Sequence, residues 1–376
     1  MLYTQDVPGS NPGVPMLKTD ALVSAVAVFL SFLAVTLFLV VIGRSPSGMY
    51  QAILQAATGL DPRRGWNMRF IGEWFVLSLP IILCALSMGF SVRSGLFNLG
   101  VEGQYIAGLT AAQVIAVFFA GNQETQVFIA HSGLAVLGAM FAGAIWGSAA
   151  GLLKVRCKVS VVISTIMMNF IALYAHRLIT MRIPGSNVFR TPDFSETALL
   201  SNAMLASITN NSRLHNGLWI TAAAVLIYWL ILNKTKFGFS LCASGFNRDN
   251  ALLTGICVKA NTVIAMTISG AFAGLAGAVV SLGMFTHGRV LTTFDGYGFI
   301  GIAAALAGNA ATAGIAIMGL FFGILTSAQP LMELRQIPGE IAFVIMGLIV
   351  VFISFKQLIQ MFTQHRVKVK VNKAQS

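Results

Sequence analysis

Charged side chains are scarce in this sequence. Only 10% of its 376 residues are Asp, Glu, Lys or Arg, whereas an ordinary soluble domain has about 25%. Hydrophobic residues make up 56% and form long runs, which places the chain among polytopic membrane proteins. The net charge of +12 does not indicate nucleic-acid binding, because the basic residues stand in short loops and in the tail 365–373 rather than in a patch interleaved with aromatic residues.

Several kinds of site are also missing. The sequence has no G-x-x-x-x-G-K-[ST] loop, which would hold nucleotide phosphates. Its histidines are scattered singly, and no His/Cys or paired-carboxylate cluster has the spacing of metal ligands. A proton-driven carrier usually needs a relay of buried carboxylates or histidines, and too few lie inside the apolar runs. We therefore expect no enzymatic activity, no cofactor in this chain, and an energy source on another polypeptide.

Ten apolar segments are expected to span or enter the membrane. They are residues 21–43, 72–92, 100–119, 129–153, 160–181, 217–233, 260–283, 297–308, 311–329 and 338–356. A helix needs about 20 residues to cross the hydrocarbon core, so the segment 297–308 is interpreted as a half-helix. The expected fold is an all-α polytopic membrane protein with about ten transmembrane segments, in which residues 21–356 form the transmembrane domain.

Basic residues set the orientation. Lysine and arginine cluster at 154–158, 234–236 and 365–373, and the positive-inside rule assigns these clusters to the cytoplasm. Ten crossings then leave both termini inside, as a tail of residues 1–20 and a basic tail of residues 357–376. Four arginines oppose this orientation, because they fall in the first outer loop: Arg44, Arg63, Arg64 and Arg69. An amphipathic segment on the membrane surface would account for them, but the sequence leaves this conflict open.

Small residues predict close helix packing. Gly143, Gly147 and Gly151 repeat every four residues and so share one face of a helix, and Gly270 and Gly274 do the same in a later segment. Such faces let helix backbones approach closely in lipid. Packing within one bundle and packing between subunits both fit this pattern.

The stretch SVRSGLFNLGVEGQYIAG (91–108) interrupts the apolar pattern with polar residues and four glycines. Two interpretations remain open. In the first, it is a broken segment on a permeation path, where Asn98, Glu102 and Gln104 offer hydrogen bonds to a polar solute. In the second, it is a cytoplasmic turn between two spans, with Arg93 marking the inner surface at the end of the first span and Glu102 near the start of the second.

Three further polar residues are candidates for the path. Tyr297 and Asn309 flank the predicted half-helix, and Asn169 is a lone amide in its span. The rings of Tyr297 and Phe299 could stack on a planar base or a sugar, or they could belong to an interfacial aromatic belt. Asn169 could contact the solute or make a hydrogen bond between helices.

A second informative stretch, residues 237–259, links two spans on the basic side. Its centre, from Asp249 to Gly255, predicts a short helix that stops at glycine, with Asp249 near the helix start, where a negative charge is favourable. Such a helix, held by a span at each end, could act as a lever, although the composition also fits an ordinary surface loop.

Four segments together resemble the permease subunits of bacterial ABC importers, in the ribose-type branch that carries simple sugars and nucleosides. They are GLFNLGVEGQ (95–104), VSVVISTIMMN (159–169), GFNRDNALLTGI (245–256) with SGAFAGLAGA (269–278), and GYGFIGIAAALAGN (296–309). The resemblance extends from about residue 72 to residue 350. The family's third segment is similar to G-x-N-x-x-A-A-x-x-x-G-I. The matching residues are Gly245, Asn247, Ala251, Gly255 and Ile256, whereas Asn250 replaces the first of the paired alanines.

The resemblance implies that residues 237–256 form the coupling helix region, which docks on a separate ATPase subunit that binds ATP. The residues expected to couple are Gly245, Asn247, Asp249, Ala251, Gly255 and Ile256. It also implies a second permease subunit, identical or different, an extracytoplasmic solute-binding protein, and a location in the bacterial cytoplasmic (inner) membrane.

The implied solute is a nucleoside, with a simple sugar such as a pentose, or a vitamin such as riboflavin, as alternatives. A self-contained secondary carrier or channel is the rival from another class. It predicts transport by this chain alone, without ATP or partner chains.

Overall fold

The computed structural model describes residues 15–61, 65–119 and 128–355. Most of the N-terminal tail predicted for 1–20, the basic tail predicted for 357–376, and Arg63 and Arg64 lie outside the described residues. The chain divides into two compact units, residues 53–327 and residues 1–52 with 328–376. Each unit is described by itself.

The fold is helical, with seven helices long and apolar enough to cross a membrane among the described residues. These helices are α3 (Met68–Arg93), α4 (Val101–Phe118), α5 (Phe128–Cys157), α6 (Val161–Thr180), α8 (Gly217–Lys234), α11 (Val258–Met284) and α13 (Thr312–Glu333). Each of them coincides with a predicted span. A polytopic helical membrane protein is therefore confirmed, whereas the count of ten spans and the cytoplasmic position of both termini remain predictions.

The other predicted segments are shorter helices in the described part of the chain. They are Ala25–Val41 within α1 (Pro15–Val41), α12 (Tyr297–Ala307) and a last helix, Ile341–Phe355. With 11 residues, α12 is about 16 Å long. This length is about half of the hydrocarbon thickness, so α12 cannot cross alone.

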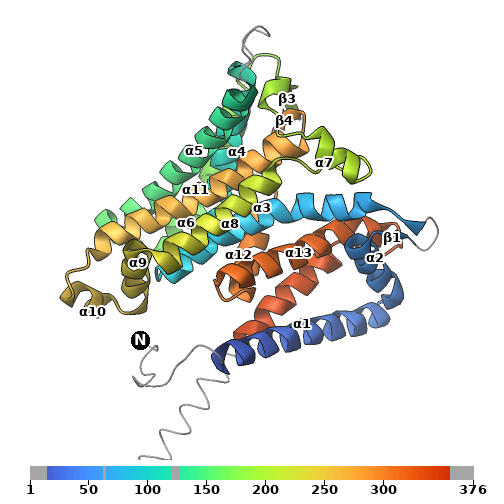
Figure 1. Ribbon diagram of the computed structural model, residues 1–376, viewed down its shortest axis with the longest axis horizontal. Helices are drawn as coiled ribbons and strands as arrows, with labels where there is room; N and C mark the ends of the chain where they lie inside the picture. Colours follow the sequence, from blue (N-terminus) through green and yellow to red (C-terminus); the bar gives the residue numbers. More distant parts are fainter. Residues whose placement is uncertain (1–14, 62–64, 120–127, 356–376) are drawn as a thin grey trace, which may run out of the picture. The chain divides into compact units, whose positions relative to one another are not determined.

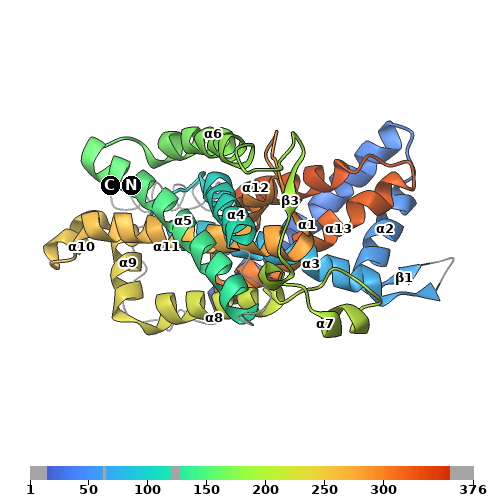
Figure 2. The ribbon, with the colours of Figure 1, turned by 90° about the horizontal axis from the view of Figure 1, so that it is seen from above.

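Helix α11 is the centre of the 53–327 unit and packs against α3, α4 and α5 (Figures 1 and 2). Gly143, Gly147 and Gly151 of α5 face α11. A Cβ added at Gly143 would overlap the carbonyl oxygen of Gly270, and one added at Gly270 would overlap that of Gly143. The two backbones therefore touch without an intervening layer of side chains.

The remaining helices surround this centre: α12 packs against α3 and α4, α6 against α4, and α8 against α3. The basic end of α5 and the short helices α9 (Lys236–Phe246) and α10 (Arg248–Leu253) lie at one end of the unit, and the strand pair lies at the other (Figure 1). That pair is β3 (Arg190–Asp193) and β4 (His287–Arg289), which are antiparallel with Arg190 opposite Arg289. The same end holds η1 (Glu196–Ala198) and α7 (Ala203–Ile208).

The arginine-rich segment of the first predicted outer loop has regular structure of its own. It contains α2 (Pro46–Thr58) and a two-residue pairing of β1 (Leu60–Asp61) with β2 (Gly65–Trp66). The indole N–H of Trp66 donates to the carbonyl of Thr58 at 2.9 Å, which closes this hairpin onto the end of α2.

In the unit of residues 1–52 with 328–376, the ring of Tyr50 stacks on Phe32 with centroids 6.0 Å apart. The hydroxyls of Tyr50 and Thr36 form a hydrogen bond of 2.7 Å. These contacts join α1 to α2.

Candidate functional site

The half-helix α12 begins at Gly296, which has a left-handed backbone (φ 86°) and no side chain to cap the helix. The carboxylate of Glu102, from the first turn of α4, takes that place. It accepts hydrogen bonds from the N–H groups of Gly296 (2.8 Å) and Gly298 (2.6 Å). The first N–H groups of a helix have no partner within the helix, and the dipole there favours negative charge. Glu102 thus satisfies these donors although it is fully buried.

The loop before α12 is also held by charge. Arg289 forms two parallel hydrogen bonds with the carboxylate of Asp295, at 3.0 and 2.5 Å. The hydroxyl of Tyr105 donates to the same carboxylate at 2.7 Å. The guanidinium of Arg289 lies 4.4 Å from the ring centroid of Phe285. This bidentate, partly buried arrangement fixes the approach to α12 against α4.

His176 of α6 holds the same loop from the other side. Its Nδ1 is 2.8 Å from the hydroxyl of Thr110, and its Nε2 accepts from the N–H of Leu291 at 3.2 Å. The loop from Arg289 to Gly298 is therefore fixed by side chains of α4 and α6.

Three of the predicted path amides lie in the interior, where they bond protein groups. The side-chain amide of Asn98 donates to Gln104 (3.1 Å) and to the hydroxyl of Ser269 (2.9 Å). Asn169 donates to the carbonyl of Leu99 (2.9 Å) and accepts from the N–H of Gly103 (2.8 Å). The segment 94–100 is a non-helical turn between α3 and α4, and Glu102 follows it in the first turn of α4.

Tyr297 and Asn309 lie at opposite ends of α12. Tyr297 packs on Tyr105 with ring centroids 5.9 Å apart, whereas Asn309 is exposed with a left-handed backbone. The structure therefore brings Glu102 and Tyr297 to one end of α12 and leaves Asn309 at the other. A role of the six candidate residues in the path stays a prediction.

Aromatic rings form an exposed surface beside α12, which we call the aromatic face and define as Phe170, Phe294 and Phe299. The rings of Phe170 and Phe294 are 5.2 Å apart, and those of Phe294 and Phe299 are 5.7 Å apart at 89°. Phe170 and Phe299 are 46% and 44% exposed. Sequence analysis named Phe299 as a stacking residue but missed Phe170 and Phe294, because the three rings come from α6, from a loop and from α12.

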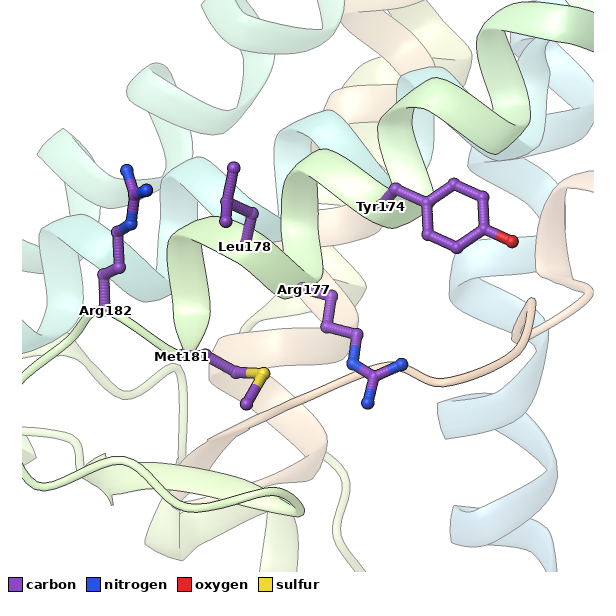
Figure 3. Close-up of a pocket in the computed structure, with 5 residues that line it drawn as sticks. All are labelled: Tyr174, Arg177, Leu178, Met181 and Arg182. Carbon is purple, nitrogen blue, oxygen red and sulfur yellow. The ribbon is translucent and has the colours of Figure 1, made fainter.

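A pocket of about 450 Å³ lies at the end of α6 that is nearer to the strand pair. Figure 3 shows its lining, which is Tyr174, Arg177, Leu178, Met181 and Arg182. Helix α6 therefore supplies both Phe170 of the aromatic face and, nearer its end, Arg177 of the pocket lining, and Arg182 follows just after the helix.

At the opposite end of the unit, the predicted coupling segment consists of two helices rather than one. The Asn247 side chain caps α10 by accepting from the N–H groups of Asp249 and Asn250, each at 3.1 Å. Gly255 ends the turn with φ 81°, and the N–H of Ile256 donates to the carbonyl of Ala251 at 2.9 Å. These are the start and stop signals of a short helix. They give Asn247, Gly255 and Ile256 of the motif a physical role.

Comparisons with known proteins identify the family of this chain. The family described as "Branched-chain amino acid transport system / permease component" matches residues 70–354. The chain is 36% identical to the guanosine ABC transporter permease protein NupP of Bacillus subtilis, over 93% of this chain and 97% of the relative.

Two further relatives cover most of the chain. The nucleoside ABC transporter permease protein NupB of Lactococcus lactis subsp. cremoris is 31% identical, over 94% of this chain and 96% of its own. The glucose ABC transporter permease protein TsgB13 of Haloferax volcanii is 27% identical, over 83% and 84%. The chain belongs to this family of ABC transporter permease components, and it is a membrane-embedded transport subunit rather than an enzyme.

Proposed function

We propose that this chain is one half of the pore of an ABC importer that carries nucleosides across the cytoplasmic membrane of a bacterium. The observation that carries the proposal is the likeness, over nearly the whole of each chain, to relatives named for guanosine and nucleoside transport, at 36% and 31% identity. The relative named for glucose is less similar, at 27% identity.

The aromatic face supports a nucleoside as the solute. A nucleobase is planar, and stacking on an aromatic side chain contributes about 1–3 kcal/mol per base. Phe170 and Phe299 present exposed rings on either side of Phe294. A base could therefore move from one ring to the next without being fully desolvated.

Helix α10 supports docking of a separate ATPase. It belongs to the segment between α8 and α11, which begins beside Lys234 and Lys236, and it lies outside the spanning helices. Leu252 and Leu253 are 53% and 86% exposed there. A partner that docked on α10 would bury both of these side chains.

A second permease subunit and a solute-binding protein complete the proposed assembly. One side of α6 exposes apolar residues along its length: Ile163, Met167, Phe170, Ile171, Tyr174 and Leu178. In the proposed assembly this surface meets the second permease, which puts the aromatic face next to the solute path. The solute-binding protein would deliver solute at the end that carries the strand pair.

The proposal is tested by ATP-dependent uptake into proteoliposomes that contain this chain with its ATPase, second permease and binding protein. Labelled guanosine, other nucleosides, a pentose and riboflavin are compared. We expect saturable uptake of nucleosides that requires ATP. Uptake of the pentose or riboflavin alone would overturn the solute assignment, and uphill transport by this chain alone would overturn the importer.

A matched pair of variants tests the aromatic face. Phe294→Ala removes the central ring and is expected to raise the KM for nucleoside about tenfold, the effect of losing one stacking contact. Phe118→Ala removes an exposed ring at the end of α4 and is expected to leave the KM unchanged. An unchanged KM in Phe294→Ala would contradict stacking at this surface.

A further inference from the structure

The turn that follows α12, which we call the α12–α13 turn and define as residues 308–311, has an unusual backbone. Asn309 and Ala310 are both left-handed, with φ of 53° and 51°. Two consecutive residues with a Cβ rarely adopt this conformation, because the Cβ crowds the following carbonyl oxygen. Gly308 and Gly314 touch backbone to backbone across this turn, so the chain reverses in a very small space.

The carbonyl of Ala310 is held by two donors from other helices. The Nε of Arg93, the last residue of α3, donates to it at 3.2 Å, and the hydroxyl of Tyr228 in α8 donates at 2.8 Å. The Tyr228 ring is itself fixed, because it packs on Phe90 and Phe272 with centroid distances of 6.1 and 6.2 Å. In addition to the packing of α12 on α3, this carbonyl oxygen thus links the far end of α12 to the end of α3 and to α8.

Both donors are connected to α9, Arg93 through the turn that follows α3 and Tyr228 through the last turns of α8. Gly95, two residues after Arg93, lies against Gly245 of α9. A Cβ on Gly245 would lie 2.5 Å from the nitrogen of Gly95 and 2.7 Å from the carbonyl oxygen of Arg93. On the other side, α8 runs into α9 through Thr235, whose hydroxyl accepts from the N–H of Gly238 at 2.9 Å. A displacement of α9 therefore moves the residues that hold Ala310.

We propose that Arg93 and Tyr228 are positioning residues that transmit movement of α9 and α10 to α12 through the carbonyl of Ala310. The inference rests on the proposed function, in which an ATPase moves α9 and α10. Glu102 holds the first turn of α12 to α4, so a pull at the α12–α13 turn tilts this half-helix about its anchored start. Phe299 lies in the first turn of α12, and the tilt would change its angle to Phe294.

The test measures nucleoside imported per ATP hydrolysed in proteoliposomes of the complete importer. Tyr228→Phe keeps the ring and removes only the hydroxyl, and Arg93→Gln removes the charged donor. We expect each variant to assemble and to hydrolyse ATP within about twofold of the original rate, with import per ATP reduced about threefold. The double variant should be reduced at least tenfold, and Arg93→Lys, which keeps a donor, should recover part of the loss.

The controls separate transmission from stability. Tyr50→Phe removes an exposed hydroxyl in the other unit, and Gly133→Ala adds a methyl group where no atom lies within 4 Å. Both should keep the original import per ATP. A double variant with the original ratio would overturn the inference, and so would a loss of assembly, ATP hydrolysis and import in parallel. If the unaltered complex imports no nucleoside, the proposed function fails instead.

Discussion

Glu102 and Gly298 are 196 positions apart in sequence, yet the Glu102 carboxylate accepts a hydrogen bond of 2.6 Å from the Gly298 backbone N–H. A second bond from Gly296 completes the attachment. The only carboxylate in α4 is thereby used inside the protein, as the cap that α12 lacks. This relationship suggests how α12 could be altered without touching its apolar surface.

Glu102→Gln should weaken the start of α12. An amide of the same shape has a single acceptor oxygen and places an N–H₂ group against a backbone donor. We expect the free energy of unfolding in detergent to fall by about 2 kcal/mol, the contribution of a hydrogen bond to a charged group. Glu196→Gln alters an exposed carboxylate and should change the free energy of unfolding by less than about 0.5 kcal/mol. Equal stability of Glu102→Gln and the original protein would rule out capping by Glu102.

Gly298→Ala should be destabilising for a steric reason. An added Cβ would lie 2.5 Å from the nitrogen and 2.6 Å from the Cα of Glu102, and these backbone atoms cannot rotate away. We expect a loss of about 1–3 kcal/mol in the free energy of unfolding, as in other overpacked interiors. Gly133→Ala, in a helix with open space around the added methyl group, should be neutral or stabilising by up to about 1 kcal/mol.

His215 should make stability depend on pH. Burial, helped by the nearby charge of Arg213, lowers the pKa of this imidazole to about 4. Its Nδ1 accepts from the N–H of Gly217 at 3.0 Å, so the folded protein holds the neutral ring. An unfolded histidine has a pKa of about 6.5. The stabilisation is therefore fully present above about pH 6.5 and is lost as the pH falls toward 4.

The free energy of unfolding should fall by on the order of 3 kcal/mol between pH 7 and pH 4 through His215, because each pKa unit corresponds to about 1.4 kcal/mol. His215→Asn removes the titrating group and should flatten the pH dependence of unfolding by that amount. The measurement compares urea unfolding of the two proteins in detergent at several pH values. Parallel curves would show that His215 does not titrate on unfolding.

Gly255 should be replaceable only by residues that tolerate a left-handed backbone. Its φ is 81°, and no atom lies within 4 Å of an added Cβ, so backbone conformation alone decides the outcome. Gly255→Val should distort the end of α10 and abolish ATP-dependent uptake while the subunit still reaches the membrane. Gly255→Asn should retain most uptake, because Asn adopts this conformation readily. Equal uptake by both variants would argue against a defined α10 as the coupling element.

Local patterns predicted the helices well. Apolar runs located all seven long spanning helices, because a helix in lipid must satisfy its backbone internally and therefore shows a long apolar run. The stop at Gly255 and the short α12 followed from similar local rules. The polar residues were harder to interpret. Glu102, Asn98 and Asn169 carry recognisable chemistry, but their partners are distant in sequence, and only the packing of α4 against α6, α11 and α12 brings them together.

Arg93 and Tyr228 show the same difficulty. Arg93 marked only an end of a span in the sequence, and Tyr228 had no signal at all. Their shared acceptor is a backbone carbonyl, which every residue possesses. Its position depends on two residues with a left-handed backbone, neither of which is glycine. No pattern of residue types predicts that contact.

The backbone-to-backbone contact between α5 and α11 restricts how these two helices can move. When two helices slide along each other, their side chains normally accommodate the movement by changing rotamers. Gly143 and Gly270 have no side chain that could do so, and each lies against the carbonyl of the other. The two backbones leave no room for a side chain between them. Helices α5 and α11 should therefore move as one rigid body. Any change of shape during a transport cycle then has to occur between helices that contact each other through longer side chains.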